Sequence, residues 1–165
     1  MSFRFAHSRR LAASIVLLFA AACSGDADLT TPSNGTPSNP ATETFAAALG
    51  VNLAAMTKRS DNLYVQDLVV GTGTEATNGR ILRVTYSGYL INGTKFDSNV
   101  GGTTFAFRLG DGAVIQGWDQ GLAGMRVGGK RKLVIGSTLG YGSRGSGPIP
   151  GNATLVFDVE LVSVS

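Results

Sequence analysis

The stretch VIQGWDQGL, residues 114–122, contains the only tryptophan of the chain, Trp118. Around it, four apolar side chains recur at helical spacing: Ile115, Trp118, Leu122 and Met125. Gly117, Gly121 and Gly124 interrupt the same window, and each interior glycine costs a helix about 1 kcal/mol relative to alanine. We therefore expect a short helix that forms only when its apolar side packs against another element.

Segments on both sides of this helix have the alternating pattern of β-strands. The clearest is ATLVFDVELVSV, residues 153–164, whose apolar face consists of Leu155, Phe157, Val159 and Leu161. Further strand-like segments are LYVQDLVV (63–70), RILRVTYSGYL (80–90), TKFDS (94–98), TFAFRLG (104–110) and KLVIG (132–136). Asn92 and Gly93 mark a tight hairpin turn between two of them. Together these segments predict an α+β domain over residues 62–165, an antiparallel sheet with one short helix against it.

The first residues have the pattern of a secretory signal. A basic start with Arg4, Arg9 and Arg10 precedes LAASIVLLFAAA, residues 11–22. This apolar run is shorter than the roughly 20 residues that a membrane span needs. We expect a signal peptide over residues 1–22, directly before Cys23, the only cysteine.

The small residues before Cys23 resemble the lipobox of bacterial lipoproteins. That resemblance implies that Cys23 is lipidated and is the first residue of the mature chain. The following Ser24 is typical of lipoproteins kept in the outer membrane, so we expect a cell-envelope location facing the periplasm. The alternative is a signal cleaved nearby, which leaves a free thiol. Residues 23–44 are rich in Ser, Thr, Pro, Asn and Gly and predict a disordered tether. Residues 45–61 predict a lead-in segment that can form a short helix.

The charge of the mature chain excludes several kinds of protein. Of 14 basic and 11 acidic residues, three basic ones lie before Cys23, which leaves 11 of each sign. No basic excess remains to bind nucleic acid, and we expect the run from Lys130 to Lys132 to be the solvated edge of a strand. The only histidine, His7, lies in the signal, so catalysis by Ser-His-Asp or Cys-His groups is excluded. We expect no metal and no cofactor.

Several motifs then occur in an order that identifies a family: VTYSGYL (84–90), NGTKFDS (92–98), FAFRLG (105–110), VIQGWDQGLAGMRVGGKRKLVI (114–135) and IPGNATLVFDVEL (149–161). In these motifs the chain from about Leu63 onward resembles the FKBP-type peptidyl-prolyl cis-trans isomerases, which also bind macrolides such as rapamycin. The resemblance implies a bent antiparallel sheet of five to six strands wrapped around one short helix. It also implies that Trp118 is the floor of a pocket, with Gly117 making a tight turn beneath it.

The family's functional residues carry over onto matching positions of this chain. The resemblance implies four catalytic residues: Tyr86, Asp97, Ile115 and Tyr141. It implies that the proline-binding walls are Phe96, Phe105, Val114, Trp118, Ile149 and Phe157. Ile115, through its backbone N–H, and Tyr141, through its hydroxyl, would hold substrate carbonyls, while Tyr86 and a buried Asp97 would form a polar wall. Phe107 and Leu155 are expected to be ordinary core residues. The stretch 98–104 contains no basic residue, where family members commonly have an arginine.

Rotation about an X–Pro bond makes and breaks no covalent bond, so it suits a chain without histidine. We expect a monomeric isomerase that assists the folding of exported proteins and binds proline-containing polypeptides and rapamycin-class macrolides. The alternatives are a non-catalytic FKBP-like binding module or chaperone on the cell envelope, and a purely structural surface lipoprotein. We also expect residues 62–165 to fold without the residues that precede them.

Overall fold

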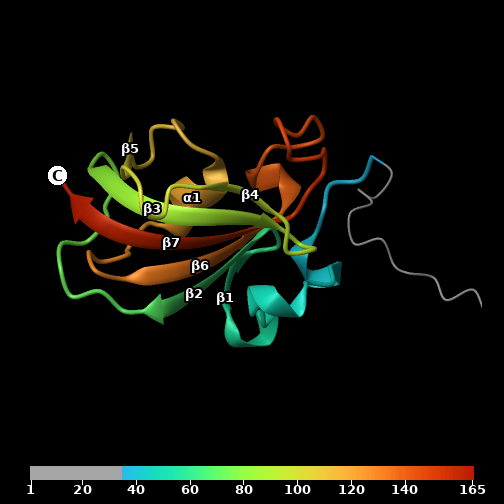
Figure 1. Cartoon of the computed structure of the whole chain (residues 1–165), viewed down its shortest axis with the longest axis horizontal. Coiled ribbons are helices and arrows are strands. Elements are labelled where there is room, and N and C mark those ends of the chain that lie inside the picture. The colour runs from blue at the N-terminus through green and yellow to red at the C-terminus, as the bar shows by residue number, and fades with distance from the viewer. Residues whose placement is uncertain (1–34) are drawn as a thin grey trace, which may run out of the picture.

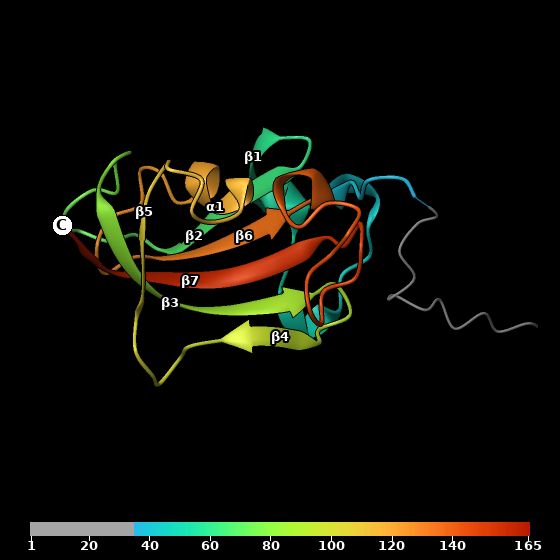
Figure 2. The same cartoon turned by 90° about the horizontal axis from the view of Figure 1, so that it is seen from above.

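The computed structural model describes residues 35–165, so the predicted signal peptide and Cys23 lie outside the described residues. This part of the chain forms one antiparallel sheet of seven strands in the order β1-β2-β6-β7-β3-β4, with β5 paired to β3 (Figures 1 and 2). The strands are β1 (Thr57–Ser60), β2 (Leu63–Val69), β3 (Ile81–Leu90), β4 (Lys95–Ser98), β5 (Phe105–Arg108), β6 (Lys130–Ile135) and β7 (Leu155–Val164). None of the helices within residues 35–165 has the length and apolar character needed to cross a membrane.

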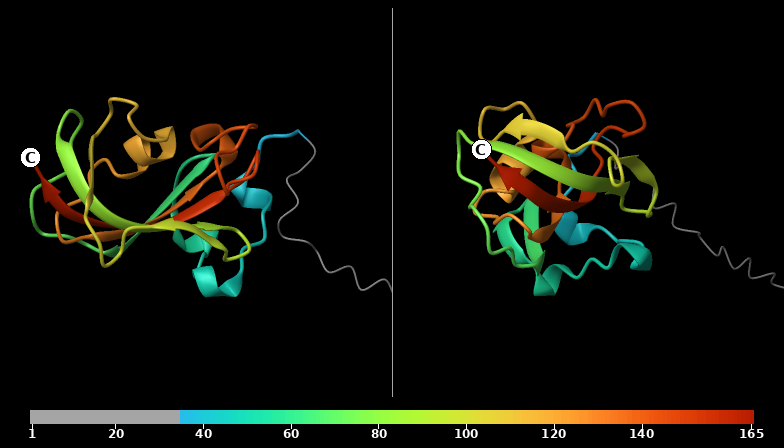
Figure 3. Two further views of the ribbon diagram at one scale, coloured as in Figure 1. Left: turned by 45° about the horizontal axis from the view of Figure 1, so that its top comes forward. Right: turned by 60° about the vertical axis from the view of Figure 1, so that its left-hand side comes forward.

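The sheet curves around the short helix α1 (Gln116–Gly121), which lies on its concave face (Figure 3). Its central strands β3 and β7 are each 10 residues long and pair along their length. Between the pairs Arg83–Ser163 and Val84–Leu161, β7 has one extra residue, Val162, which marks a bulge in β7, and bulges increase the local twist of a strand. The predicted α+β fold is confirmed, but the sheet has seven strands rather than five to six. The difference includes β1, which comes from the segment before residue 62.

Two glycines let α1 lie close to the sheet. A Cβ atom on Gly117 would lie 2.5 Å from Ile135 Cγ2, and one on Gly121 would lie 2.8 Å from Leu133 Cδ2. Both distances are shorter than van der Waals contact. Gly117 was expected in a tight turn, but it lies inside the helix, where its missing side chain permits close packing on β6. The helix therefore forms against the sheet and carries the buried Trp118 with it.

The segment before residue 62 packs on the outer face of the sheet, which corrects two predictions. Three 3₁₀ turns, η1 (Pro40–Thr42), η2 (Ala47–Leu49) and η3 (Leu53–Ala55), precede β1 in place of the expected short helix. Leu49 and Met56 are buried against Tyr64, Val134 and Val156 on the face opposite α1. The stretch predicted as a disordered tether, residues 23–44, therefore includes the structured turn η1, and the folded region begins before residue 62. Composition could not predict this docking because the partners on β6 and β7, Val134 and Val156, are remote in the sequence.

The basic run at the start of β6 is largely buried, contrary to the prediction of a solvated strand edge. Arg131 and Lys132 are 4% and 6% exposed. Arg131 donates two hydrogen bonds to the carboxylate of Asp67 on β2, at 2.7 and 3.0 Å. Lys132 donates to Asp158 on β7 at 2.5 Å. Burial of a cation is costly unless it is paired, and here each cation meets a carboxylate on the adjacent strand.

Candidate active site

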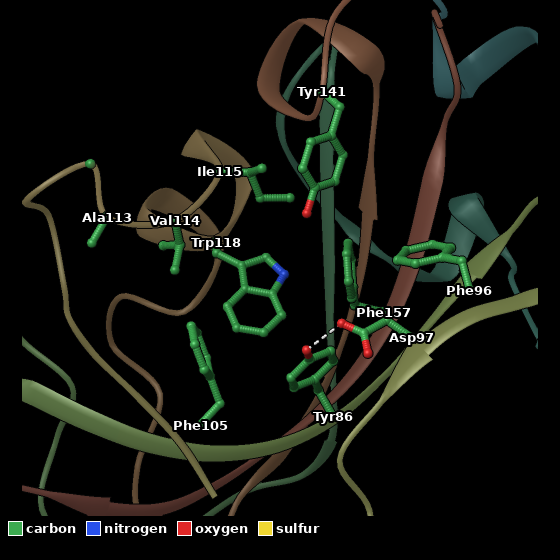
Figure 4. Close-up of a pocket in the computed structure, with 11 residues that line it drawn as sticks. Tyr86, Phe96, Asp97, Phe105, Ala113, Val114, Ile115, Trp118, Tyr141 and Phe157 are labelled. Carbon is green, nitrogen blue, oxygen red and sulfur yellow. Dashed lines mark hydrogen bonds between the residues drawn. The ribbon is translucent and has the colours of Figure 1, made fainter. Parts of the chain in front are cut away.

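A cavity of about 370 Å³ opens between α1 and the concave face of the sheet (Figure 4). Its walls come from β3, β4, β5, β7, α1 with the loop before it, and the loop after η4 (Ser137–Leu139). All the predicted site residues except Ile149 line it: Tyr86, Phe96, Asp97, Phe105, Val114, Ile115, Trp118, Tyr141 and Phe157. The fold therefore brings together side chains from five separate motifs and Tyr141, which lies between the last two of them.

Aromatic rings form the floor and one side of the cavity. Trp118 is 4% exposed, and its ring centroid lies 5.0 Å from that of Tyr86 and 5.3 Å from that of Phe157, both edge-to-face. Phe96 meets Phe157 edge-to-face at 5.6 Å. Gly88 on β3 makes room for these rings, because a Cβ atom there would lie 2.6 Å from Phe96 Cζ. Sequence analysis did not single out Gly88, although a glycine inside a strand often marks such a close approach.

Tyr86 and Asp97 form the polar wall of the cavity. The Tyr86 hydroxyl donates a hydrogen bond of 2.5 Å to Asp97 Oδ2 (Figure 4). Burial raises the pKa of Tyr86 well above its ordinary value, and the bond to the Asp97 carboxylate raises it further. The Tyr86 hydroxyl therefore stays protonated at physiological pH. Asp97 was expected to be buried, but the residue is exposed. It lies at the cavity mouth on the edge strand β4, where water reaches it.

Asn99 holds the backbone of Tyr86 in place, a role that sequence analysis missed. Its Oδ1 accepts a hydrogen bond of 2.7 Å from the Tyr86 N–H, and its own N–H donates to the Tyr86 carbonyl at 3.1 Å. Its Nδ2 donates to the Val84 carbonyl at 3.1 Å. Both β4 and β5 pair with β3. Between these two pairings, Asn99 supplies the hydrogen bonds to the backbone of β3. An asparagine after a strand end was the available signal, but such residues usually mark turns.

Two residues on the opposite side of the cavity, Ile115 and Tyr141, carry hydrogen-bond donors without a partner in the described part of the chain. Ile115 caps α1 in an extended conformation, and within residues 35–165 no hydrogen bond engages its N–H. The hydroxyl of Tyr141 is likewise unpaired in the described part of the chain, and the residue is 39% exposed. Burial raises the pKa of Tyr141, and the nearby Asp97 carboxylate adds to this. The Tyr141 hydroxyl therefore stays protonated. The Ile115 N–H and this hydroxyl are both free to donate hydrogen bonds to carbonyl oxygens.

Ile149 does not line the cavity, which corrects its prediction as a substrate-binding residue. It is 6% exposed and belongs to the apolar core, and its backbone pairs with Ser146 within the rim loop. Gly112 and Ala113 line the cavity instead, and their small side chains gave no sequence signal. Phe107 and Leu155, predicted to be core residues, are 6% and 0% exposed.

The family described as FKBP-type peptidyl-prolyl cis-trans isomerase matches residues 72–162. The chain belongs to this family. The FKBP-type match begins within the loop after β2 and ends two residues before the end of β7. It includes every residue that lines the cavity.

Related proteins and solved structures agree with the FKBP-type assignment. An FK506-binding protein of Neisseria meningitidis serogroup A is 51% identical over 105 residues, which are 62% of this chain and 96% of that protein. FK506-binding protein 2 of Dictyostelium discoideum is 49% identical over 121 residues, 70% of this chain and 90% of its own length. FK506-binding protein 4 of Rhizopus delemar is longer, and the 51% identical match covers 29% of it.

Solved FKBP-type structures share both fold and sequence with this chain. FkpA from Escherichia coli has a TM-score of 0.62 and 43% identity, with 67% of this chain and 52% of that chain covered. AtFKBP13 has a TM-score of 0.59 and 41% identity, with 62% of this chain and 93% of that chain covered. The matches agree with the bent antiparallel sheet and short helix of the FKBP-type fold.

Proposed function

We propose that this FKBP-type isomerase accelerates the rotation of X–Pro bonds in exported proteins, held at the cell envelope by a lipid on Cys23. The observation that carries the catalytic part is the cavity itself. Aromatic rings line its floor, a tyrosine–carboxylate pair forms one wall, and two unpaired donors face it from the other side. No step of the reaction requires a proton to be transferred, so the tyrosines act as neutral donors.

The apolar cavity favours the twisted amide over the planar one. Resonance in the planar amide separates charge, which water stabilises, and its loss creates a barrier of about 18–20 kcal/mol. In an apolar pocket the planar form loses more solvation than the twisted form does, and only such a difference accelerates the reaction. A thousandfold acceleration requires about 4 kcal/mol. Trp118, Phe96 and Phe157 hold the proline ring in this environment.

The polar groups of the cavity select which part of the substrate turns. The N–H of Ile115 and the hydroxyl of Tyr141 bind carbonyl oxygens of the substrate on one side of the proline. The Tyr86–Asp97 pair then faces the carbonyl that rotates. Fixing one part of the chain while the other turns converts binding energy into orientation. We expect rapamycin-class macrolides to occupy the same pocket, and the similarity to relatives named for FK506 binding supports this expectation.

A test of catalysis compares the full-length parent with Trp118→Ala and Asp97→Leu in an isomerisation assay on an X–Pro tetrapeptide. We expect the parent to accelerate both this reaction and the proline-limited refolding of a model protein. A parent that binds the peptide but accelerates neither reaction would be an FKBP-like binding module or chaperone. Binding of rapamycin, followed by calorimetry, tests the macrolide site independently of turnover.

The sequence before Cys23 supports the envelope location. A basic start, an apolar run and small residues precede the cysteine, and we expect Cys23→Ser to release the protein from the outer-membrane fraction. A variant that fractionates like the parent would contradict lipidation. We also expect the released protein to sediment as a monomer, and sedimentation of a dimer would contradict that part of the proposal.

A further inference from the structure

A pair of serines joins the N-terminal segment to the turn that precedes the rim of the cavity. Ser38 donates its backbone N–H to Ser137 Oγ at 2.9 Å, and Ser137 donates its N–H to Ser38 Oγ at 2.8 Å. The two residues are 99 positions apart in the sequence. They are 4% and 1% exposed, so water does not compete for these hydrogen bonds, and each lost bond would leave a buried donor unpaired.

A second contact lies one residue away from this pair. Pro40 in η1 is buried and approaches Gly136, where a Cβ atom would lie 3.0 Å from Pro40 Cδ and 2.2 Å from Asn62 Oδ1. The Gly136 N–H donates to the Asn62 carbonyl at 2.9 Å. The N-terminal segment therefore fits against two successive residues at the end of β6, and a larger residue at position 136 would push it away.

Ser137 in turn fixes both neighbours of Tyr141. Its carbonyl accepts hydrogen bonds from the N–H of Gly140 at 3.1 Å and of Gly142 at 2.9 Å. Tyr141 itself has no side-chain hydrogen bond within the described residues, so nothing at its hydroxyl end holds the ring. The place of this hydroxyl in the cavity (Figure 4) is therefore determined by the backbone that Ser137 organises.

We infer that Ser38 is a positioning residue for Tyr141, and that the segment around residues 38–40 is part of the support of the active site. The inference rests on the proposed function, in which the Tyr141 hydroxyl binds a substrate carbonyl. Composition predicted a disordered tether over these residues, but they pack against the turn before Tyr141. A segment that was expected only to link the domain to a lipid on Cys23 would therefore also affect the catalytic site. Loss of the segment would lower activity without touching any residue that lines the cavity.

The first experiment measures kcat/KM on an X–Pro tetrapeptide for the full-length parent, Ser38→Ala and Ser137→Ala, well below their melting temperatures. We expect both variants to lose about 2- to 10-fold in kcat/KM, the equivalent of one net hydrogen bond to the substrate. Asn52→Ala is the matched control, since it removes an exposed backbone–side-chain bond to Ala54 in the same N-terminal segment and should match the parent. If the parent is active and Ser38→Ala has the same kcat/KM, the inference is overturned. If the parent itself is inactive, the proposed function is contradicted.

Combination with Tyr141→Phe separates positioning from general loss of stability. If Ser38 acts through the Tyr141 hydroxyl, Ser38→Ala should have no further effect in the Tyr141→Phe background. A loss of the same size in both backgrounds would overturn the inference, because Ser38 would then act elsewhere. Amide exchange provides a readout that needs no activity. The N–H groups of Gly140 and Gly142 should exchange faster in Ser38→Ala but not in Asn52→Ala, and unchanged protection would likewise overturn the inference.

Discussion

The concave face of the sheet is covered by a six-residue helix and several aromatic rings, whereas the outer face is covered at one end by an irregular segment. On the concave face, large side chains such as Trp118 and Phe157 interlock with a contiguous core. On the outer face, Leu49 and Met56 form a small cluster with three residues of the strands. The concave face therefore combines stability with the site, while the outer segment adds stability and contacts the turn before Tyr141 through Ser137.

Substitution of the pocket floor should have the largest effect. Trp118→Ala removes a buried aromatic side chain, and such changes cost about 3–5 kcal/mol of stability. It should also abolish isomerase activity, because the proline ring loses its main contact. Urea unfolding and the tetrapeptide assay measure the two losses separately.

Leu161→Ala is the control for Trp118→Ala. Leu161 is 1% exposed and does not line the cavity, so this variant should lose comparable stability but keep its activity at low temperature. Retained activity in Trp118→Ala would contradict the assignment of Trp118 to the site.

Substitution on the outer face should affect stability alone. Met56→Ala removes a side chain that is 7% exposed in the small cluster, and we expect a loss of about 2 kcal/mol, the lower end for such changes. kcat/KM should stay at the parent value, since the side chain contacts neither Ser137 nor the cavity. A loss below about 0.5 kcal/mol, the usual range for surface positions, would show that residues 45–56 undock in solution.

The sequence predicted the concave face well because its determinants are local. Helical spacing around Trp118 and alternation in residues 153–164 indicate which side chains are buried, and family motifs then relate them to a pocket. All predicted site residues but Ile149 line the cavity. Ile149 was misplaced because the conformation of its loop depends on hydrogen bonds within the loop, which leave no pattern in the sequence.

Features that depend on distant polar contacts could not be predicted. Ser38 and Ser137 lie in a linker-like segment and a turn, and neither is marked by periodicity. From the sequence Asn99 resembles an ordinary turn residue. Its hydrogen bonds to β3 become clear only in the structure, where the later strand β5 also pairs with β3. Asp97 was expected to be buried because the motif implied a pocket wall, but β4 is an edge strand, and edges face water. In each case the burial or partner of a polar group depends on a remote segment.

Asp97 offers a test of the polar wall with little effect on stability. Asp97→Leu removes the acceptor of the Tyr86 hydroxyl and should lower kcat/KM about tenfold, which equals about 1.4 kcal/mol. Because Asp97 is exposed, the change should cost at most about 1 kcal/mol of stability, the value of one hydrogen bond. Asp97→Asn keeps an acceptor and should retain more activity than Asp97→Leu. Equal activity in Asp97→Leu and the parent would leave the aromatic walls as the whole source of catalysis.

The smallest effect is expected from pH, because both tyrosines of the site stay neutral over the physiological range. Burial raises the pKa of Tyr86 and of Tyr141 above the ordinary value of 10.0, so kcat/KM should be constant between about pH 6 and 9. The folded state binds these protons more tightly than the unfolded chain does. Their contribution to stability is therefore complete below about pH 10 and is lost as the pH rises through the raised pKa. Melting temperatures of the parent and Tyr86→Phe should converge above about pH 10, because the variant has no proton to lose at this position. A fall in kcat/KM near neutral pH would instead reveal a titrating group in the reaction and contradict a mechanism without proton transfer.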